Sequence, residues 1–64
     1  MEIRTENQAN ITIVNALNNL DTMLAEFRFT TDATRLEIIA AINVYTEELS
    51  AATNYIAALP KVGA

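Results

Sequence analysis

Apolar residues recur at helical spacing along the second half of the chain. Their positions are separated by 4, 3, 4, 3, 4 and 3 residues, which is a heptad pattern on one face of an α-helix. The residues of this stripe are Ile38, Ile42, Tyr45, Leu49, Ala52, Ile56 and Leu59. No Gly or Pro interrupts the stretch before Pro60, where a helix has to stop. The pattern predicts a helix over about residues 32–59.

The first half of the chain predicts a second helix, over about residues 6–28. Its apolar stripe has spacings of 4, 3, 4 and 3 and consists of Ile13, Leu17, Leu20, Leu24 and Phe27. Three further apolar residues widen the stripe on one side: Ala9, Ala16 and Met23. At the start, Thr5 and Gln8 have the spacing of a capping box, and Glu6 falls in the first turn, where the helix dipole favours negative charge.

The junction between the two stretches predicts a tight turn at residues 29–31. Consecutive Thr residues and Asp32 favour an N-cap over a continuing helix, and Thr34 with Glu37 offers a second capping box. The two stripes are also out of register across the junction. We therefore expect an antiparallel helical hairpin whose closed end is plugged by Phe27 and Phe29. The alternative is one continuous helix with a stutter, in a parallel coiled coil.

The second helix carries more apolar surface than one stripe explains. Leu36 and Ile39 lie on one flank, and Val44 and Tyr55 lie on the other. A two-helix hairpin has a single internal seam, so these residues, together with Phe29, are candidates for an oligomer or partner interface. The fold class expected is all-α: a single hairpin domain with a short tail at residues 60–64, dimerising into a four-helix bundle.

Length and composition favour the same oligomer. A chain of 64 residues buries only about 60% of the surface that its unfolded form exposes, so small folds usually need a further source of stability. The sequence contains no Cys and no His, which excludes a disulfide and leaves only carboxylates for a zinc site. Hydrophobic residues make up 52% of the chain. We expect a homo-oligomer with a dimer favoured, and no metal or cofactor.

The charge balance argues against direct nucleic-acid binding. Eight acidic residues against four basic ones give a net charge of −4, and DNA and RNA are polyanions. The four bases, Arg4, Arg28, Arg35 and Lys61, are scattered along the chain. No signal peptide is recognisable, and charged and amide residues interrupt the second helix too often for a membrane span. The expected location is therefore cytoplasmic.

No residue pattern predicts catalysis. Glu47 and Glu48 are helix neighbours that diverge by about 100°, and the hydroxyls of Thr46, Ser50 and Thr53 have no base beside them. We expect a noncatalytic protein–protein interaction or assembly module, a kind of small protein found among phage and mobile-element accessory proteins. The alternative is an acidic inhibitor that covers a basic, nucleic-acid-binding surface of a target protein. Its acidic residues are Glu26, Asp32, Glu37, Glu47 and Glu48.

Overall fold

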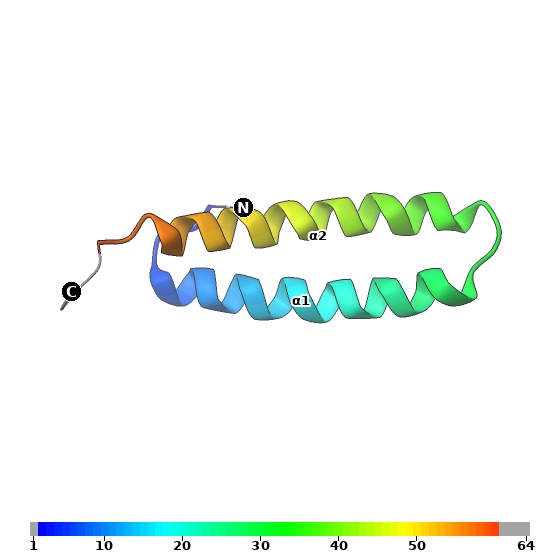
Figure 1. Cartoon of the computed structure of the whole chain (residues 1–64), viewed down its shortest axis with the longest axis horizontal. Helices are drawn as coiled ribbons and strands as arrows, with labels where there is room; N and C mark the ends of the chain where they lie inside the picture. Colours follow the sequence, from blue (N-terminus) through cyan, green and yellow to red (C-terminus); the bar gives the residue numbers. More distant parts are fainter. Residues whose placement is uncertain (1, 61–64) are drawn as a thin grey trace.

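The chain folds as a helical hairpin. The computed structural model describes residues 2–60 and contains two α-helices, α1 (Glu6–Phe29) and α2 (Thr34–Ala57). They run antiparallel and side by side in a rod of 51 × 17 × 15 Å (Figure 1). No strand occurs in these residues. The prediction of an all-α chain with two helices is confirmed, and a single continuous helix is excluded.

The start of α1 follows the predicted capping box with one difference. Thr5 has an extended backbone, and its Oγ1 accepts a hydrogen bond of 3.1 Å from the backbone N–H of Gln8. The Gln8 side-chain oxygen in turn accepts a 2.8 Å hydrogen bond from the backbone N–H of Arg4. In the usual capping box the donor is the N–H of the N-cap residue, here Thr5, so this bond lies one residue earlier. The helix end is thereby tied to the segment that precedes it.

The turn that joins the helices is organised by Asp32. Its Oδ1 accepts a hydrogen bond of 2.9 Å from the N–H of Thr34, and its carbonyl accepts from Arg35 N at 3.1 Å. Ala33 occupies the N-cap position without a side-chain bond. Helix α2 consequently begins at Thr34, two residues after the predicted start. Of the two predicted capping sites, Asp32 supplies the side-chain bond, and Thr34 is the first residue of the helix. At the other end α2 stops at Ala57, before the predicted residue 59.

Small residues form the seam where the helices meet. Ala9, Ala16 and Ala52 are 0% exposed, and Thr12 and Ile38 are also buried. Side chains this small let two helix axes approach closely. The centre of the core is therefore narrow, and Ile38 is its largest buried side chain within residues 2–60.

The seam on α1 is not the stripe that the sequence predicts. Leu17 and Leu24 are 51% and 53% exposed, so they lie outside it. The face that meets α2 is centred on the fully buried alanines, with Ile13, Leu20, Met23 and Phe27 half-buried around them. Helix geometry puts this face roughly 60° around α1 from the predicted stripe. The prediction that Leu17 and Leu24 belong to the core of the hairpin is thus corrected. The α2 stripe residues Ile42, Tyr45, Leu49, Ile56 and Leu59 are half-buried.

The closed end is not plugged by two phenylalanines. Phe29 is 85% exposed, whereas Phe27 is half-buried with the Arg35 guanidinium carbon 4.0 Å from its ring centroid. Because α1 continues through Phe29, residues 27 and 29 are about 200° apart around the helix and cannot both face α2. The prediction was wrong for Phe29. The predicted tail lies outside the described residues apart from Pro60.

Candidate functional site

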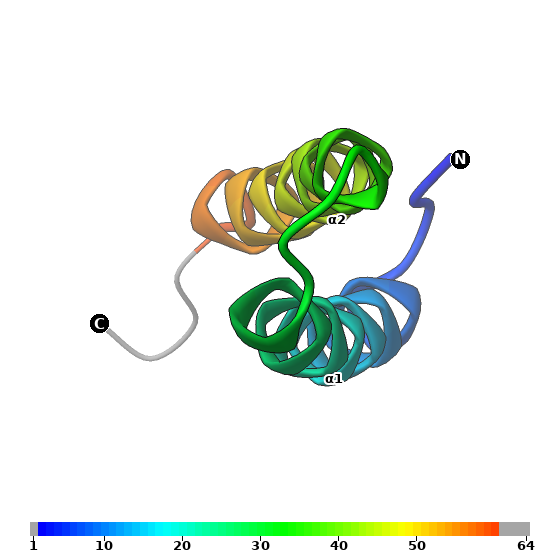
Figure 2. The ribbon, with the colours of Figure 1, turned by 90° about the vertical axis from the view of Figure 1, so that its right-hand side faces the viewer.

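The hairpin has two long faces, and the N-terminal arm (residues 2–5) lies over part of one of them. The arm crosses from the start of α1 to α2 and lies on one side of the hairpin (Figures 1 and 2). Ile3 lines a shallow recess on α2 with Val44, Glu47, Glu48 and Ala51. We call this side of the molecule the arm face.

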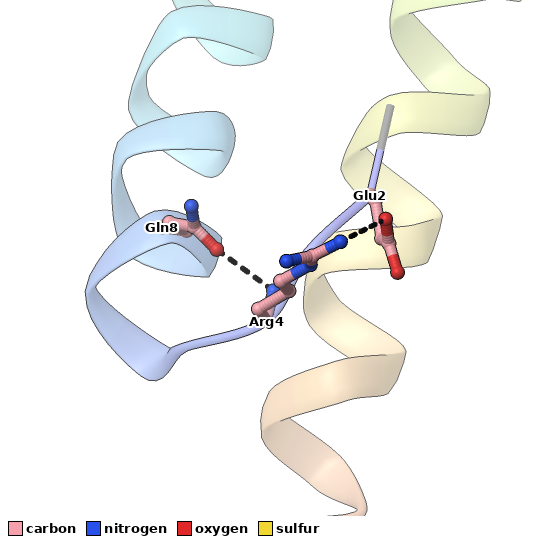
Figure 3. Close-up of polar contacts among 3 residues, drawn as sticks. All are labelled: Glu2, Arg4 and Gln8. Atoms are coloured by element: carbon pink, nitrogen blue, oxygen red, sulfur yellow. Dashed lines mark hydrogen bonds and ion pairs between the residues drawn. The ribbon is translucent and has the colours of Figure 1, made fainter.

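Tyr55 attaches the arm to α2. Its hydroxyl donates a 2.8 Å hydrogen bond to the carbonyl oxygen of Arg4, a contact between residues 51 positions apart. Figure 3 shows the arm's other polar contacts, namely the Gln8 bond to Arg4 and a 2.9 Å ion pair between Arg4 and Glu2. The ion pair is exposed and therefore contributes little. The Tyr55 bond and the Ile3 contact are the features that hold the arm against α2.

The opposite side of the hairpin is apolar and uncovered. Successive helix residues are about 100° apart, which places Leu17 and Leu24 on one flank of α1 and Ile39 and Ile42 on one flank of α2. Because the helices are antiparallel, these two flanks lie on the same side of the hairpin, opposite the arm. We call this surface the uncovered apolar face; its residues are Ile13, Leu17, Leu20, Leu24, Ile39, Ile42 and Leu49.

Three of these side chains are about half open to solvent. Leu17, Leu24 and Ile39 are 51%, 53% and 41% exposed, and the other four are half-buried against the seam. By helix geometry these seven residues lie on the same side of both helices. An exposed apolar surface shared by two helices is a candidate interaction site.

The structure does not bring the five predicted interface residues together. Ile39 lies on the uncovered apolar face, but Val44 and Tyr55 lie on the arm face, where Tyr55 binds the chain's own N-terminal arm. Leu36 and Phe29 are exposed and point away from the seam. Sequence reasoning missed Leu17 and Leu24, which it placed in the core. The apolar sector of α1 is wider than one seam can cover, and that width was the available signal.

Charged residues are distributed unequally between the two faces. By helix geometry the carboxylates of Glu26, Glu37 and Glu48 lie on the arm face, and Glu47 lies beside them on the outer side of α2. In the turn, hydrogen bonding from the Thr34 backbone and side chain lowers the pKa of the exposed Asp32 carboxyl. The edge of the uncovered apolar face carries both signs of charge, with Asp21 near Arg28.

Two hydroxyls of the row on α2, those of Thr46 and Thr53, are bonded to their own helix. Thr46 Oγ1 donates to the carbonyl of Ile42 at 2.8 Å, and Thr53 Oγ1 donates to that of Leu49 at 3.0 Å. Among residues 2–60 no group of three or more Asp or Glu side chains could hold a metal ion. Neither helix in this range is long and apolar enough to cross a membrane.

Comparisons of the chain with protein-family models, with curated proteins and with solved structures found no match.

Proposed function

We propose that this protein is a noncatalytic assembly module that acts by self-association, as a small homo-oligomeric helical hairpin. The observation that carries the proposal is the uncovered apolar face, on which Leu17 and Leu24 are each about half exposed. The chain presents surface for recognition along two helices, and the hydroxyls of Thr46 and Thr53 are bonded to its own backbone.

The exposed area supports the proposal. The chain exposes 4905 Å² for a mass of 7.0 kDa, whereas a compact monomer of that mass exposes about 4000 Å². The excess is about 900 Å². A standard protein–protein interface buries about 800 Å² on each partner. The surplus of the whole chain is thus close to the area that one subunit contributes to a standard interface.

The small core supports it as well. Three of the four buried hydrophobic residues are alanines, and Ala side chains supply little apolar area to a core. A second hairpin packed on the first would give a four-helix bundle, in which the half-buried leucines and isoleucines gain a complete set of neighbours. Folding and association are then coupled, as in small proteins that lack a stable isolated monomer.

Sedimentation equilibrium over a wide concentration range, with helix content followed by circular dichroism on the same samples, tests the proposal. We expect a dimer at high concentration and a loss of helix content as it dissociates. A fully helical monomer at all concentrations up to the millimolar range would contradict self-association.

A second candidate function is an acidic inhibitor that covers a basic surface of a target protein. The observation that favours it is the position of Glu26, Glu37 and Glu48 on the arm face, beside Glu47. Binding through these carboxylates weakens steeply with salt, because exposed charges are screened over about 8 Å at physiological ionic strength. Association through the uncovered apolar face changes little with salt, so a salt titration separates the two functions.

A further inference from the structure

We infer that the uncovered apolar face is the surface through which two copies of this chain pair, and that their arm faces point outward. This inference deepens the proposed self-association, on which it rests, by naming the face and the occupant. The occupant is a second copy related by a two-fold axis, so the same residues of each copy contribute to both sides of the contact.

Coverage of the hairpin argues for this face. On the arm face, Ile3 lies against α2 and Tyr55 holds the arm through its bond to Arg4. The chain thus covers part of that side itself. On the uncovered apolar face Leu17 and Leu24 remain half exposed. The surplus area of about 900 Å² for the whole chain is close to the area that one subunit buries in a standard interface.

Charge argues for a second copy as the occupant. Two molecules of net charge −4 repel unless their surplus charge is kept apart. The carboxylates of Glu26, Glu37, Glu47 and Glu48, half of the eight acidic groups, lie away from the uncovered apolar face. In the proposed pair these groups are separated by about two helix diameters, roughly 20 Å, which is more than two Debye lengths.

The edge of the contact is also suited to a second copy. Asp21 and Arg28 lie on the α1 flank, and Arg35 lies at the α2 flank near the turn. Acidic and basic groups at one edge allow opposite charges to meet when the same edge is repeated by symmetry. The hydroxyls of Thr46 and Thr53 add a polar border whose donors are already bonded to their own helix. The result is an apolar centre with a polar rim, as in known interfaces.

Three glutamate variants with matched exposure test the inference by sedimentation equilibrium. Leu24→Glu changes the uncovered apolar face, Ile11→Glu changes the outer side of α1, and Val44→Glu changes the arm face. The original residues are 53%, 52% and 52% exposed, so each variant adds one carboxylate at a site of nearly equal openness. We expect Leu24→Glu to weaken dimerisation about a hundredfold or more, because the pair buries two unpaired carboxylates. The other two variants should dimerise as the wild type does.

Alkylation of single cysteines gives a measurement that does not need a charged variant to fold. The sequence has no Cys, so Leu24→Cys and Ile11→Cys each carry one reactive thiol. The reaction of Leu24→Cys with iodoacetamide should slow as protein concentration rises through the dissociation constant, and that of Ile11→Cys should not.

The outcomes separate the choice of face from the proposed function. A wild-type protein that stays monomeric at all concentrations contradicts self-association itself. If the wild type dimerises but Val44→Glu or Ile11→Glu disrupts the dimer as strongly as Leu24→Glu, only the assignment of the face is overturned. Concentration-independent alkylation of Leu24→Cys in a dimerising protein overturns that assignment too.

Discussion

Replacement of Ile38 by alanine is the sharpest test of the narrow seam. Ile38 is 6% exposed and is the largest buried side chain of the described hairpin. The substitution removes three carbon groups, each worth about 0.8 kcal/mol of burial, so the lost transfer free energy is about 2.4 kcal/mol. The cavity left behind raises the loss in unfolding free energy to about 2–4 kcal/mol. A folded chain of this length has only about 3–10 kcal/mol in total, so a large part of its stability is removed.

The same substitution at Ile11 is the matched control. Ile11 is 52% exposed on the outer side of α1, so Ile11→Ala loses about half as much burial. Alanine is also the better helix former by about 0.4 kcal/mol, which offsets part of that loss. The net change should stay below about 1 kcal/mol.

Urea unfolding at one fixed protein concentration, followed by circular dichroism, measures both changes. The two variants should differ by about 1.5 kcal/mol or more in unfolding free energy, and Ile38→Ala should be the less stable of the two. Equal losses at the two positions would refute the seam assignment, because they would mean that Ile11 is as well packed as Ile38.

The remaining predictions concern the alanine seam, the N-terminal arm and the turn. Ala16→Leu should lower the unfolding free energy by about 1–3 kcal/mol in thermal or urea unfolding, since the fully buried site has no room, whereas the exposed Ala25→Leu should be near neutral. Tyr55→Phe removes the hydroxyl bond to Arg4; hydrogen exchange should show faster exchange in residues 2–5 with α1 and α2 protected as before, and unchanged exchange would contradict the arm contact. The folded-state pKa of Asp32 lies below its unfolded value of 3.8, so its contribution to stability is full above that value and disappears as pH falls through the folded pKa. As the pH falls from about 5 to about 2, the unfolding free energy of Asp32→Asn should therefore decrease less than that of the wild type. Identical dependence of stability on pH in the two proteins would contradict the role of Asp32 in the turn.

The sequence was sufficient to predict the hairpin because its signals were local and agreed with one another. The 4, 3 spacing defines both helices, and the Thr5 capping box starts α1 at the observed residue. The exact start of α2 was harder to predict, because several neighbouring polar residues can each act as an N-cap. Asp32 accepts a bond from the N–H of Thr34, and α2 begins at Thr34.

The rotation of α1 was not predictable from residue type alone. A leucine contributes more hydrophobicity than an alanine, so pattern reading centres the core on Leu17 and Leu24. The packed pair instead places Ala9 and Ala16 at the line of closest approach, because only small side chains let the backbones come together there. Two neighbouring apolar sectors of α1 could face α2, and the packing of the folded hairpin decides which one does. The position of the arm also depends on the folded structure, because it is set by the long-range Tyr55 bond.

Intermolecular nuclear Overhauser effects in a mixed sample test the pairing of two copies through the uncovered apolar face. One half of the protein is labelled with ¹³C and the other half is unlabelled, so that filtered spectra detect only contacts between copies. We expect contacts from the methyl groups of Leu17, Leu24 and Ile39 to the other copy, and none from Ile11 or Val44. Contacts between copies that involve Val44 in place of Leu17 and Leu24 would contradict this pairing.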